Sequence, residues 1–400
     1  MRGASSGVMS RAGPEAGLIL INAGTAARRE AARELATELA RAADWELVSA
    51  KLDARRLMPA LGERMLNLCP SRARSRFATA VERSIAQTRR QGALVGLVSS
   101  HLTQALTQAG IRSLILKGAF LAEAIYRDPG RRATSDIDLL VAPGDLPGAV
   151  EVVRRTGYGT PKDPVGSEGL PVLHYALTHD SGRLPALDLH WRVHWYERAF
   201  AADMLERATE DDRFGLRATP LDELVGLLLF YARDGFLDLR LAIDLATWWD
   251  LLGARLQAGA LAEIIDRYPD LSRALLAAAG VAEQIVGVPA ERLLGGEHRA
   301  DLRTRLATRL ANPDGRGDPA QLNAEIGMVD WLLAPRGGQR EFIRRQLLPP
   351  RRVLEERSRM GERHMVSPLG HGVRVLARYG LTMARMAAST RARPASRRLA

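Results

Sequence analysis

The chain of 400 residues contains a single cysteine, Cys69. One thiol cannot build a disulfide framework within a chain, nor a zinc site that needs several cysteine ligands. Proteins with so few cysteines are typical of reducing compartments. The sequence therefore predicts a cytoplasmic protein without disulfides.

Long hydrophobic runs are also missing. The longest run, over residues 224–232, is about half of the ~18 apolar residues that a membrane-spanning helix needs. The segment "GLILINAG" (17–24) is a poor signal peptide, because Pro14 and Glu15 stand where a basic flank is expected. We expect no transmembrane segment, and the 46% apolar and 26% charged residues are typical of a globular protein.

Lysine is scarce. Only three of the 57 basic residues are lysine, namely Lys51, Lys117 and Lys162. The chain uses arginine almost wherever a positive charge is sufficient. Lys117 is of interest because it lies shortly before the segment with the most unusual pattern of charges, "SDIDLLV" (135–141).

The net charge of +11 comes entirely from the C-terminal end. Residues 336–400 hold 16 arginines and 4 glutamates, a charge of +12, whereas the preceding 335 residues have a charge of −1. A basic end of this kind is most often solvated, but it can also bind RNA or an anionic membrane surface. Residues 368–398 can form a helix with Val373, Leu376, Tyr379 and Met383 on one side, a pattern that suits packing against its own domain or lying on a membrane.

Changes in composition and periodicity divide the chain into five parts. We expect a flexible, Gly/Ala/Ser-rich N-terminus over 1–24, a helical region over 25–110, a core with strands over 111–218, a second helical region over 219–335, and a basic, partly helical tail over 336–400. The second helical region begins with Thr219 as helix cap and Pro220 at the first helical position. Within it, Asp244 is expected to pair with Arg240, one helical turn earlier.

The core alternates between strands and helices. "SLILKG" (113–118) predicts a strand, "AFLAEAIY" (119–126) a helix, "RDPGRRATS" (127–135) a loop, and "DIDLLV" (136–141) the next strand. "PVLHYALTH" (171–179) and "LPALDLHW" (184–191) alternate with period two and are joined by "DSGR", which is typical of a β-hairpin. A hairpin beside a strand-helix-strand unit predicts a mixed sheet, and hence an α/β (α+β) fold.

Asp136 and Asp138 place two carboxylates on one face of their strand, because side chains alternate along a strand. Ile137, Leu139 and Val141 point to the other face. Two close carboxylates repel each other and lose solvation, so they need a compensating cation. Hard oxygen ligands without cysteine or clustered histidine nearby favour Mg²⁺, which is commonly held by one or two carboxylates together with substrate phosphates.

Asp188 in "ALDLHW" provides a third carboxylate. Asp188 and His190 face the same way on their strand, and the hairpin can bring them beside Asp136 and Asp138. Three carboxylates on neighbouring strands can hold two metal ions, one at an attacking hydroxyl and one at the leaving phosphates. His190 is expected to orient Asp188 from behind. A plain salt bridge to a nearby arginine is the alternative interpretation of Asp188.

Lys117 and Gly118 suggest a phosphate site. The glycine lets the backbone approach a phosphate, the following helix offers free N–H groups, and Lys117 adds a point charge. Arg132, four residues before Asp136, can form a fork onto the same phosphates. Plain surface charges remain the alternative interpretation of Lys117 and Arg132.

Together these segments resemble a known family. A strand ending in Lys-Gly, a helix ending in Tyr, a Gly-x-Arg-x-x-Ser-Asp-hydrophobic-Asp segment and a later "DLHW" strand are similar to the uncharacterised nucleotidyltransferase family of the DNA polymerase beta superfamily. The motif positions are Gly130, Arg132, Ser135, Asp136 and Asp138. The helical regions on both sides and the basic end also look like this family, so the resemblance covers most of the chain.

The resemblance implies a polymerase-beta-like core that transfers nucleotides with the help of metal ions. It implies Asp136 and Asp138 as metal ligands and Asp188 as the third catalytic carboxylate. We assign the bound nucleotide to Lys117, Gly118, Arg132 and Ser135. One departure concerns "LLLFYARDGF" (227–236), in which relatives often show a histidine near residues 231–233 that is absent here.

The sequence thus predicts an enzyme that uses two Mg²⁺ ions to move a nucleoside monophosphate from an NTP, such as ATP, to an acceptor, with release of pyrophosphate. A small molecule, a peptide, a sugar or a tRNA would all suit as the acceptor. Two alternatives stay open. The first is a catalytically silent scaffold that binds nucleotides, and the second is a protein that docks on RNA or membrane through residues 336–400.

Overall fold

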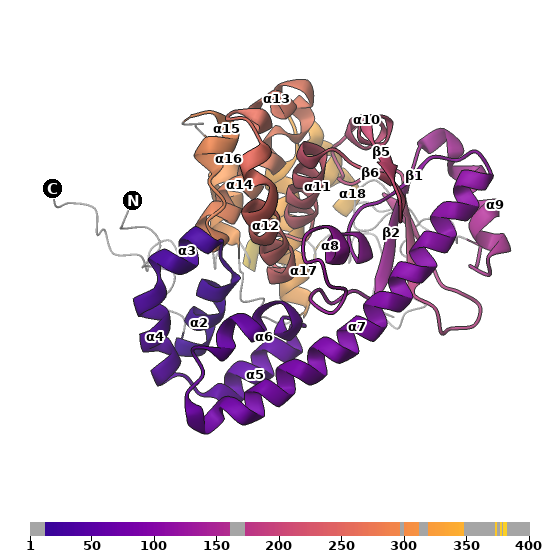
Figure 1. Ribbon diagram of the computed structural model, residues 1–400. Coiled ribbons are helices and arrows are strands. Elements are labelled where there is room, and N and C mark those ends of the chain that lie inside the picture. Colours follow the sequence, from indigo (N-terminus) through magenta and orange to yellow (C-terminus); the bar gives the residue numbers. More distant parts are fainter. Residues whose placement is uncertain are drawn as a thin grey trace.

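Figure 1 shows the computed structural model of the chain, which describes residues 13–160, 173–296, 300–311, 319–347, 373, 377 and 379–381. Helices predominate, and a small sheet lies beside them. Most of the predicted basic tail lies outside the described residues, and of the helix expected over 368–398 only residues 373, 377 and 379–381 are described, all of them helical.

The N-terminal part is helical as expected. Its helices are α2 (Pro14–Ala23), α3 (Ala26–Ala31), α4 (Arg33–Ala42), α5 (Trp45–Ala54), α6 (Met58–Leu66) and α7 (Ser71–Gln108). The helix α7 has 38 residues and runs from α5 and α6 to the sheet (Figure 1). It therefore connects the N-terminal helices with the core.

The prediction of a flexible N-terminus over 1–24 is wrong for residues 14–23. These residues form α2, whose apolar side chains are buried, with Leu18 fully enclosed. The helix packs on α4, α5 and α6, and also on the second helical region. Burying the run "GLILINA" releases its apolar surface from water, and this gain outweighs the flexibility that the surrounding Gly and Ala residues suggest. Residues 1–12 lie outside the described residues.

The core contains a four-stranded sheet with the order β1-β2-β4-β3. Its strands are β1 (Ser113–Ile115), β2 (Asp136–Val141), β3 (His174–Leu177) and β4 (Ala186–His190). Strands β2 and β4 are parallel, whereas β1 pairs with β2 and β3 with β4 in antiparallel fashion. The expectations of a mixed sheet and of a β3–β4 hairpin are therefore confirmed.

Shorter elements complete the core. They are α8 (Ala119–Ala124), η1 (Pro143–Asp145), α9 (Leu146–Arg155), α10 (Phe200–Arg207) and a second hairpin of β5 (Thr209–Asp211) and β6 (Gly215–Arg217). One face of β2 is fully apolar, with Ile137, Leu139 and Val141 each at most 1% exposed. The opposite face of β2 carries the two aspartates.

The second helical region follows. Its elements are α11 (Pro220–Arg233), α12 (Leu239–Leu252), η3 (Gly253–Arg255), α13 (Ala260–Arg267), η4 (Pro269–Leu271), α14 (Ser272–Val286), α15 (Ala290–Leu294), α16 (Leu302–Leu310), α17 (Pro319–Leu333) and α18 (Gly338–Leu347). Thr219 caps α11 as predicted, since its hydroxyl accepts the backbone N–H of Asp222 at 3.2 Å. Among the described residues, no helix is long and apolar enough to cross a membrane.

Candidate functional site

The three predicted carboxylates lie on two adjacent parallel strands. In the register of β2 and β4, Asp138 is the partner of Asp188, and Asp136 lies two residues before Asp138 on the same face. Because residues that are partners in a parallel pair of strands lie side by side, this register alone places the side chains of Asp138 and Asp188 next to each other. The structure thus brings together Asp136, Asp138 and Asp188, as the sequence predicts.

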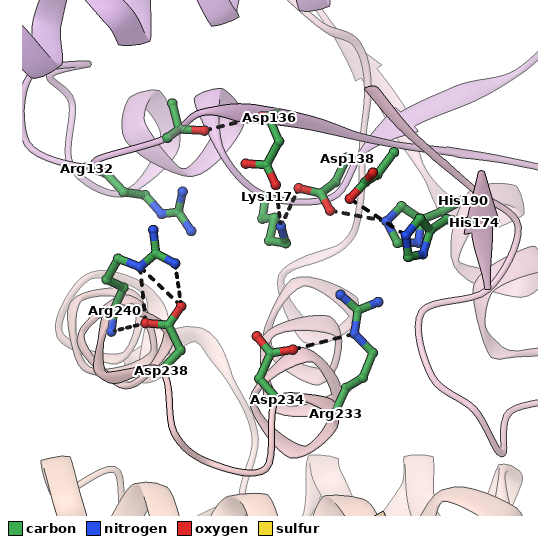
Figure 2. Close-up of polar contacts among 12 residues, drawn as sticks. Lys117, Arg132, Asp136, Asp138, His174, His190, Arg233, Asp234, Asp238 and Arg240 are labelled. Carbon is green, nitrogen blue, oxygen red and sulfur yellow. Dashed lines mark hydrogen bonds and ion pairs between the residues drawn. The ribbon is translucent and has the colours of Figure 1, made fainter. Parts of the chain in front are cut away.

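Lys117, two residues after the end of β1, is directed at these carboxylates (Figure 2). Its ammonium donates a hydrogen bond to Asp138 Oδ2 and lies 3.9 Å from Asp136 Oδ2. It also lies 5.4 Å from the centre of the Phe230 ring, a contact that a cation finds favourable. In this structure Lys117 is therefore the counter-ion of the carboxylates, and its contact with phosphate stays a prediction.

Asp138 is almost fully buried, at 1% exposure. Its second oxygen, Oδ1, lies 3.2 Å from Nε2 of the buried His190. Burial alone would raise the pKa of Asp138, but Lys117 and His190 hold it well below its usual range. The carboxylate is therefore ionised, with a partner on each oxygen.

The expectation that His190 orients Asp188 is wrong, since its ring contacts Asp138 instead. Side chains two residues apart on one strand stand about 6.6 Å from each other, so the ring meets the neighbouring strand first. The residue beside Asp188 is His174 of β3, with Nε2 at 3.9 Å from Asp188 Oδ2. The rings of His174 and His190 lie tilted by 38° with their centres 4.6 Å apart, and burial lowers the pKa of His174 to about 3.

Asp188 is protonated more readily than an ordinary aspartate. Burial, followed by the charge of Asp138, raises the pKa of Asp188 to about 6. Asp138, Asp188 and His190 each offer one ligand atom, and these atoms lie within 4.8 Å of one another. Two carboxylates and an imidazole at this spacing fit a divalent cation, and Asp136 lies next to them with its side chain 41% exposed.

A cavity of about 530 Å³ opens over this group. The core contributes Lys117, Gly118, Asp188 and residues 132–136 to its walls, while the two helical regions contribute residues 54–57 and 233–234 with 237–241. Asp138 is buried beneath the cavity and does not line it. The cavity therefore lies where three distant parts of the chain meet.

The backbone conformation at the base of this cavity requires a glycine at position 118. Its φ is +67°, in the region that favours glycine, and a Cβ there would lie 3.0 Å from Thr134 Oγ1. The following helix, α8, has only six residues. Ser135 is exposed and lines the same cavity, so the predicted nucleotide-binding residues Lys117, Gly118, Arg132 and Ser135 all face one space.

Arg132 lines the cavity, but its guanidinium is bound to a carboxylate of α12. Its guanidinium forms an ion pair with the buried Asp244 on α12, with Nε at 2.9 Å from Oδ2. The Tyr126 hydroxyl donates to the same carboxylate at 2.8 Å. The expected pair of Asp244 with Arg240 is thus wrong, because Arg240 is bound to Asp238, the N-cap of α12 (Figure 2).

The loop before β2 is fixed to the N-terminal helices. Asp128 receives two hydrogen bonds from Arg89 of α7, and Arg131 forms an ion pair with Glu63 of α6 at 2.6 Å. A Cβ at Gly130 would lie 3.0 Å from the Ile85 carbonyl oxygen, so the loop can approach α7 closely only with glycine there. The motif residue Gly130 therefore serves packing, and the first helical region positions Arg132 and Ser135.

The turn between α11 and α12 contributes residues that the sequence analysis did not assign. Arg233 and Asp234, 3.7 Å apart, and Asp238 project toward the cavity opposite Lys117 (Figure 2). Two consecutive residues of this turn, Gly235 and Phe236, have φ of +62°. An "RDGFLD" turn between two apolar helices is the signal that could have indicated these residues.

Comparison with known proteins agrees with the geometry. The profile of a family described as "Uncharacterised nucleotidyltransferase" matches residues 41–287, more than half of the chain. The chain belongs to this family. The match confirms the resemblance seen in the motifs and supports nucleotidyl transfer as the general activity. It includes all the residues that line the cavity, from residue 54 to residue 241. Neither the curated proteins nor the solved structures give a significant match.

Proposed function

We propose that this nucleotidyltransferase transfers a nucleoside monophosphate from an NTP to an acceptor in the cavity over Asp136, Asp138 and Asp188. The observation that carries the proposal is the register of β2 and β4, which places Asp138 directly beside Asp188 with Asp136 on the same face. Three carboxylates at one point of a sheet cost free energy unless cations bind there. We propose a polymerase-beta-like arrangement for this core.

The site residues fit divalent metal ions. Asp136, Asp138 and Asp188 would hold two Mg²⁺ ions, because carboxylate oxygens are the ligands that Mg²⁺ prefers. When bound, these ions polarise the acceptor oxygen and neutralise the phosphates. His190 donates from its Nε2–H to Asp138 Oδ1 and fixes the orientation of that carboxylate.

The protein's own groups then hold and orient the substrates. Gly118 leaves room for a phosphate at the base of the cavity, while Arg132 and Ser135 line the same side. The acceptor's oxygen forms a bond to the α-phosphorus and loses its proton to the solvent, and the bond to the pyrophosphate breaks. Pyrophosphate leaves with that electron pair. With a metal ion held at Asp138, the ammonium of Lys117 would be free to donate to the phosphates.

A nucleotide-binding scaffold without catalysis is the second candidate. The ammonium of Lys117 already occupies Asp138 Oδ2, so a permanent ion pair there would close the site to metal ions.

A docking role of residues 336–400 on RNA or anionic membrane stays a prediction. Deleting that segment and measuring tRNA and vesicle binding would test it.

The experiment that tests the proposal uses NTPs labelled at either the α- or the γ-phosphorus, with Mg²⁺ and host lysate as a source of acceptors. We expect the α-label, but not the γ-label, to enter an acceptor, and we expect Asp138→Asn to abolish this transfer. Transfer of the γ-label would show a kinase-type reaction instead. Binding of NTP without any transfer would favour the scaffold.

A further inference from the structure

Arg56 has a backbone conformation that arginine rarely adopts. It follows α5 with a φ of +53°, in the left-handed region. The N–H of Leu57 bonds to the Leu52 carbonyl at 2.7 Å, and the N–H of Arg56 bonds to the Asp53 carbonyl at 2.9 Å. These two bonds define a Schellman motif with Arg56 at C′, the position where glycine is the usual residue.

Packing does not explain this arginine. Its side chain is exposed, and no hydrogen bond, ion pair or ring contact joins it to another residue in the described part of the chain. Glycine would fit the same turn without the strain that a Cβ adds in this conformation. A strained residue that the fold does not need is a reason to look for a ligand.

The surroundings of Arg56 indicate which ligand. Arg56 lines the cavity together with Gly118, Ser135 and Asp136, although it comes from the first helical region. Two other arginines of the cavity are already paired, Arg132 with Asp244 and Arg240 with Asp238. The guanidinium of Arg56 has no such carboxylate partner among the described residues, so its charge is available to an anion in the cavity.

We propose that Arg56 binds the triphosphate of the nucleotide in this cavity. The inference rests on the proposed function and adds a phosphate ligand from outside the motif. A guanidinium forms forked hydrogen bonds with phosphate oxygens, which a triphosphate presents on three successive groups. From its turn at the edge of the cavity, the Arg56 guanidinium can reach the β- and γ-phosphates on the side of the cavity formed by Gly118 and Ser135, so that the pyrophosphate leaves toward a positive charge.

The chain offers a matched control for this idea. Arg127 is also exposed, also has a left-handed backbone with φ of +56°, and does not line the cavity. Arg56→Gly and Arg127→Gly should both raise the melting temperature slightly, because each removes backbone strain. Only Arg56→Gly should weaken binding of Mg·ATP and of inorganic tripolyphosphate, by roughly tenfold to a hundredfold.

The binding should be measured by titration calorimetry at low salt, with Arg56→Lys as a variant that keeps the charge and Arg56→Asn as a second variant that tolerates the left-handed backbone. Unchanged binding of both probes by Arg56→Gly, or equal losses in Arg127→Gly, would overturn the inference while leaving the proposed function intact. Absence of Mg·ATP and tripolyphosphate binding by the wild-type protein would overturn both.

Discussion

The ammonium of Lys117 and the buried carboxylate of Asp138 form an ion pair at the centre of the site. Asp138 is 1% exposed, and the side chain of Lys117 is 17% exposed. A carboxylate so deeply buried needs a positive partner when no metal ion is present. Lys117 and a metal ion therefore compete for Asp138 Oδ2, and the scarcity of lysine elsewhere in the chain agrees with a specific role.

Lys117→Met should destabilise the metal-free protein by about 3–5 kcal/mol, because it leaves a buried charge without its partner. Urea unfolding measures this loss. Adding Mn²⁺ should restore more stability to Lys117→Met than to the wild type, since the lysine no longer competes. The double variant Lys117→Met/Asp138→Asn should regain part of the loss in the absence of metal. Equal responses of wild type and Lys117→Met to Mn²⁺ would refute the competition.

Asp136→Asn and Asp138→Asn should both abolish nucleotide transfer but should differ in stability. Asp136 is 41% exposed and has one distant cation, so Asp136→Asn should change the free energy of unfolding by less than about 0.5 kcal/mol. Asp138→Asn removes the carboxylate that both Lys117 and His190 contact, and should cost more than Asp136→Asn. Calorimetry with and without Mg·NTP distinguishes the two effects. Wild-type transfer by either variant would exclude that carboxylate as a ligand.

Much of this site could be predicted from local patterns. The alternation in "DIDLLV" places Asp136 and Asp138 on one face, and the same alternation in "ALDLH" sets the face on which Asp188 lies. Which face a side chain takes depends only on the geometry of its strand, which the sequence encodes over a few residues, whereas the parallel pairing of β2 with β4 brings the two faces together. The three aspartates of β2 and β4 accordingly lie together as predicted, whereas His190 of β4 contacts Asp138 and not Asp188.

The wrong predictions concern contacts between distant segments. Asp244 was expected to pair with Arg240 on the same helix, but it binds Arg132, 112 residues away in the chain. Such a contact depends on how α12 packs against the core, which periodicity does not reveal. The same reason explains why the residues of the α11–α12 turn and Arg56 were not assigned to the cavity.

Metal binding should depend on pH through Asp188. Since its pKa is raised to about 6 and a metal ligand must be deprotonated, Mn²⁺ affinity should rise about tenfold per pH unit up to about pH 6 and level off above. The stability of the metal-free protein should change in the opposite direction and fall as the pH rises. A pKa above the unfolded value of about 4 favours folding at low pH, and this contribution is lost as the pH rises to about 6.

The control for this pH dependence is Asp188→Asn, in which both trends should disappear. Mn²⁺ titrations by electron paramagnetic resonance between pH 5 and pH 8 provide the affinities. Wild-type affinity that is constant over this range would contradict the assignment of Asp188 as a ligand.

Arg132→Met should destabilise the protein by about 3–5 kcal/mol, because it leaves Asp244 buried without its guanidinium partner. Tyr126→Phe removes a single hydrogen bond to the same carboxylate and should cost about 1 kcal/mol. Urea unfolding gives both values. A loss for Arg132→Met no larger than that for Tyr126→Phe would show that the ion pair does not anchor the loop of residues 127–135 to α12.

The central claim is that Asp136, Asp138 and Asp188 together hold metal ions and a nucleotide. The most direct measurement is calorimetric titration of the protein with Mn²⁺ and α,β-methylene-ATP, an analogue that cannot transfer its α-phosphorus. We predict saturable binding by the wild type and by Glu34→Gln, an exposed acidic residue on α4, and a loss of at least roughly tenfold in both Asp136→Asn and Asp188→Asn. Binding of equal strength by all four proteins would contradict the claim.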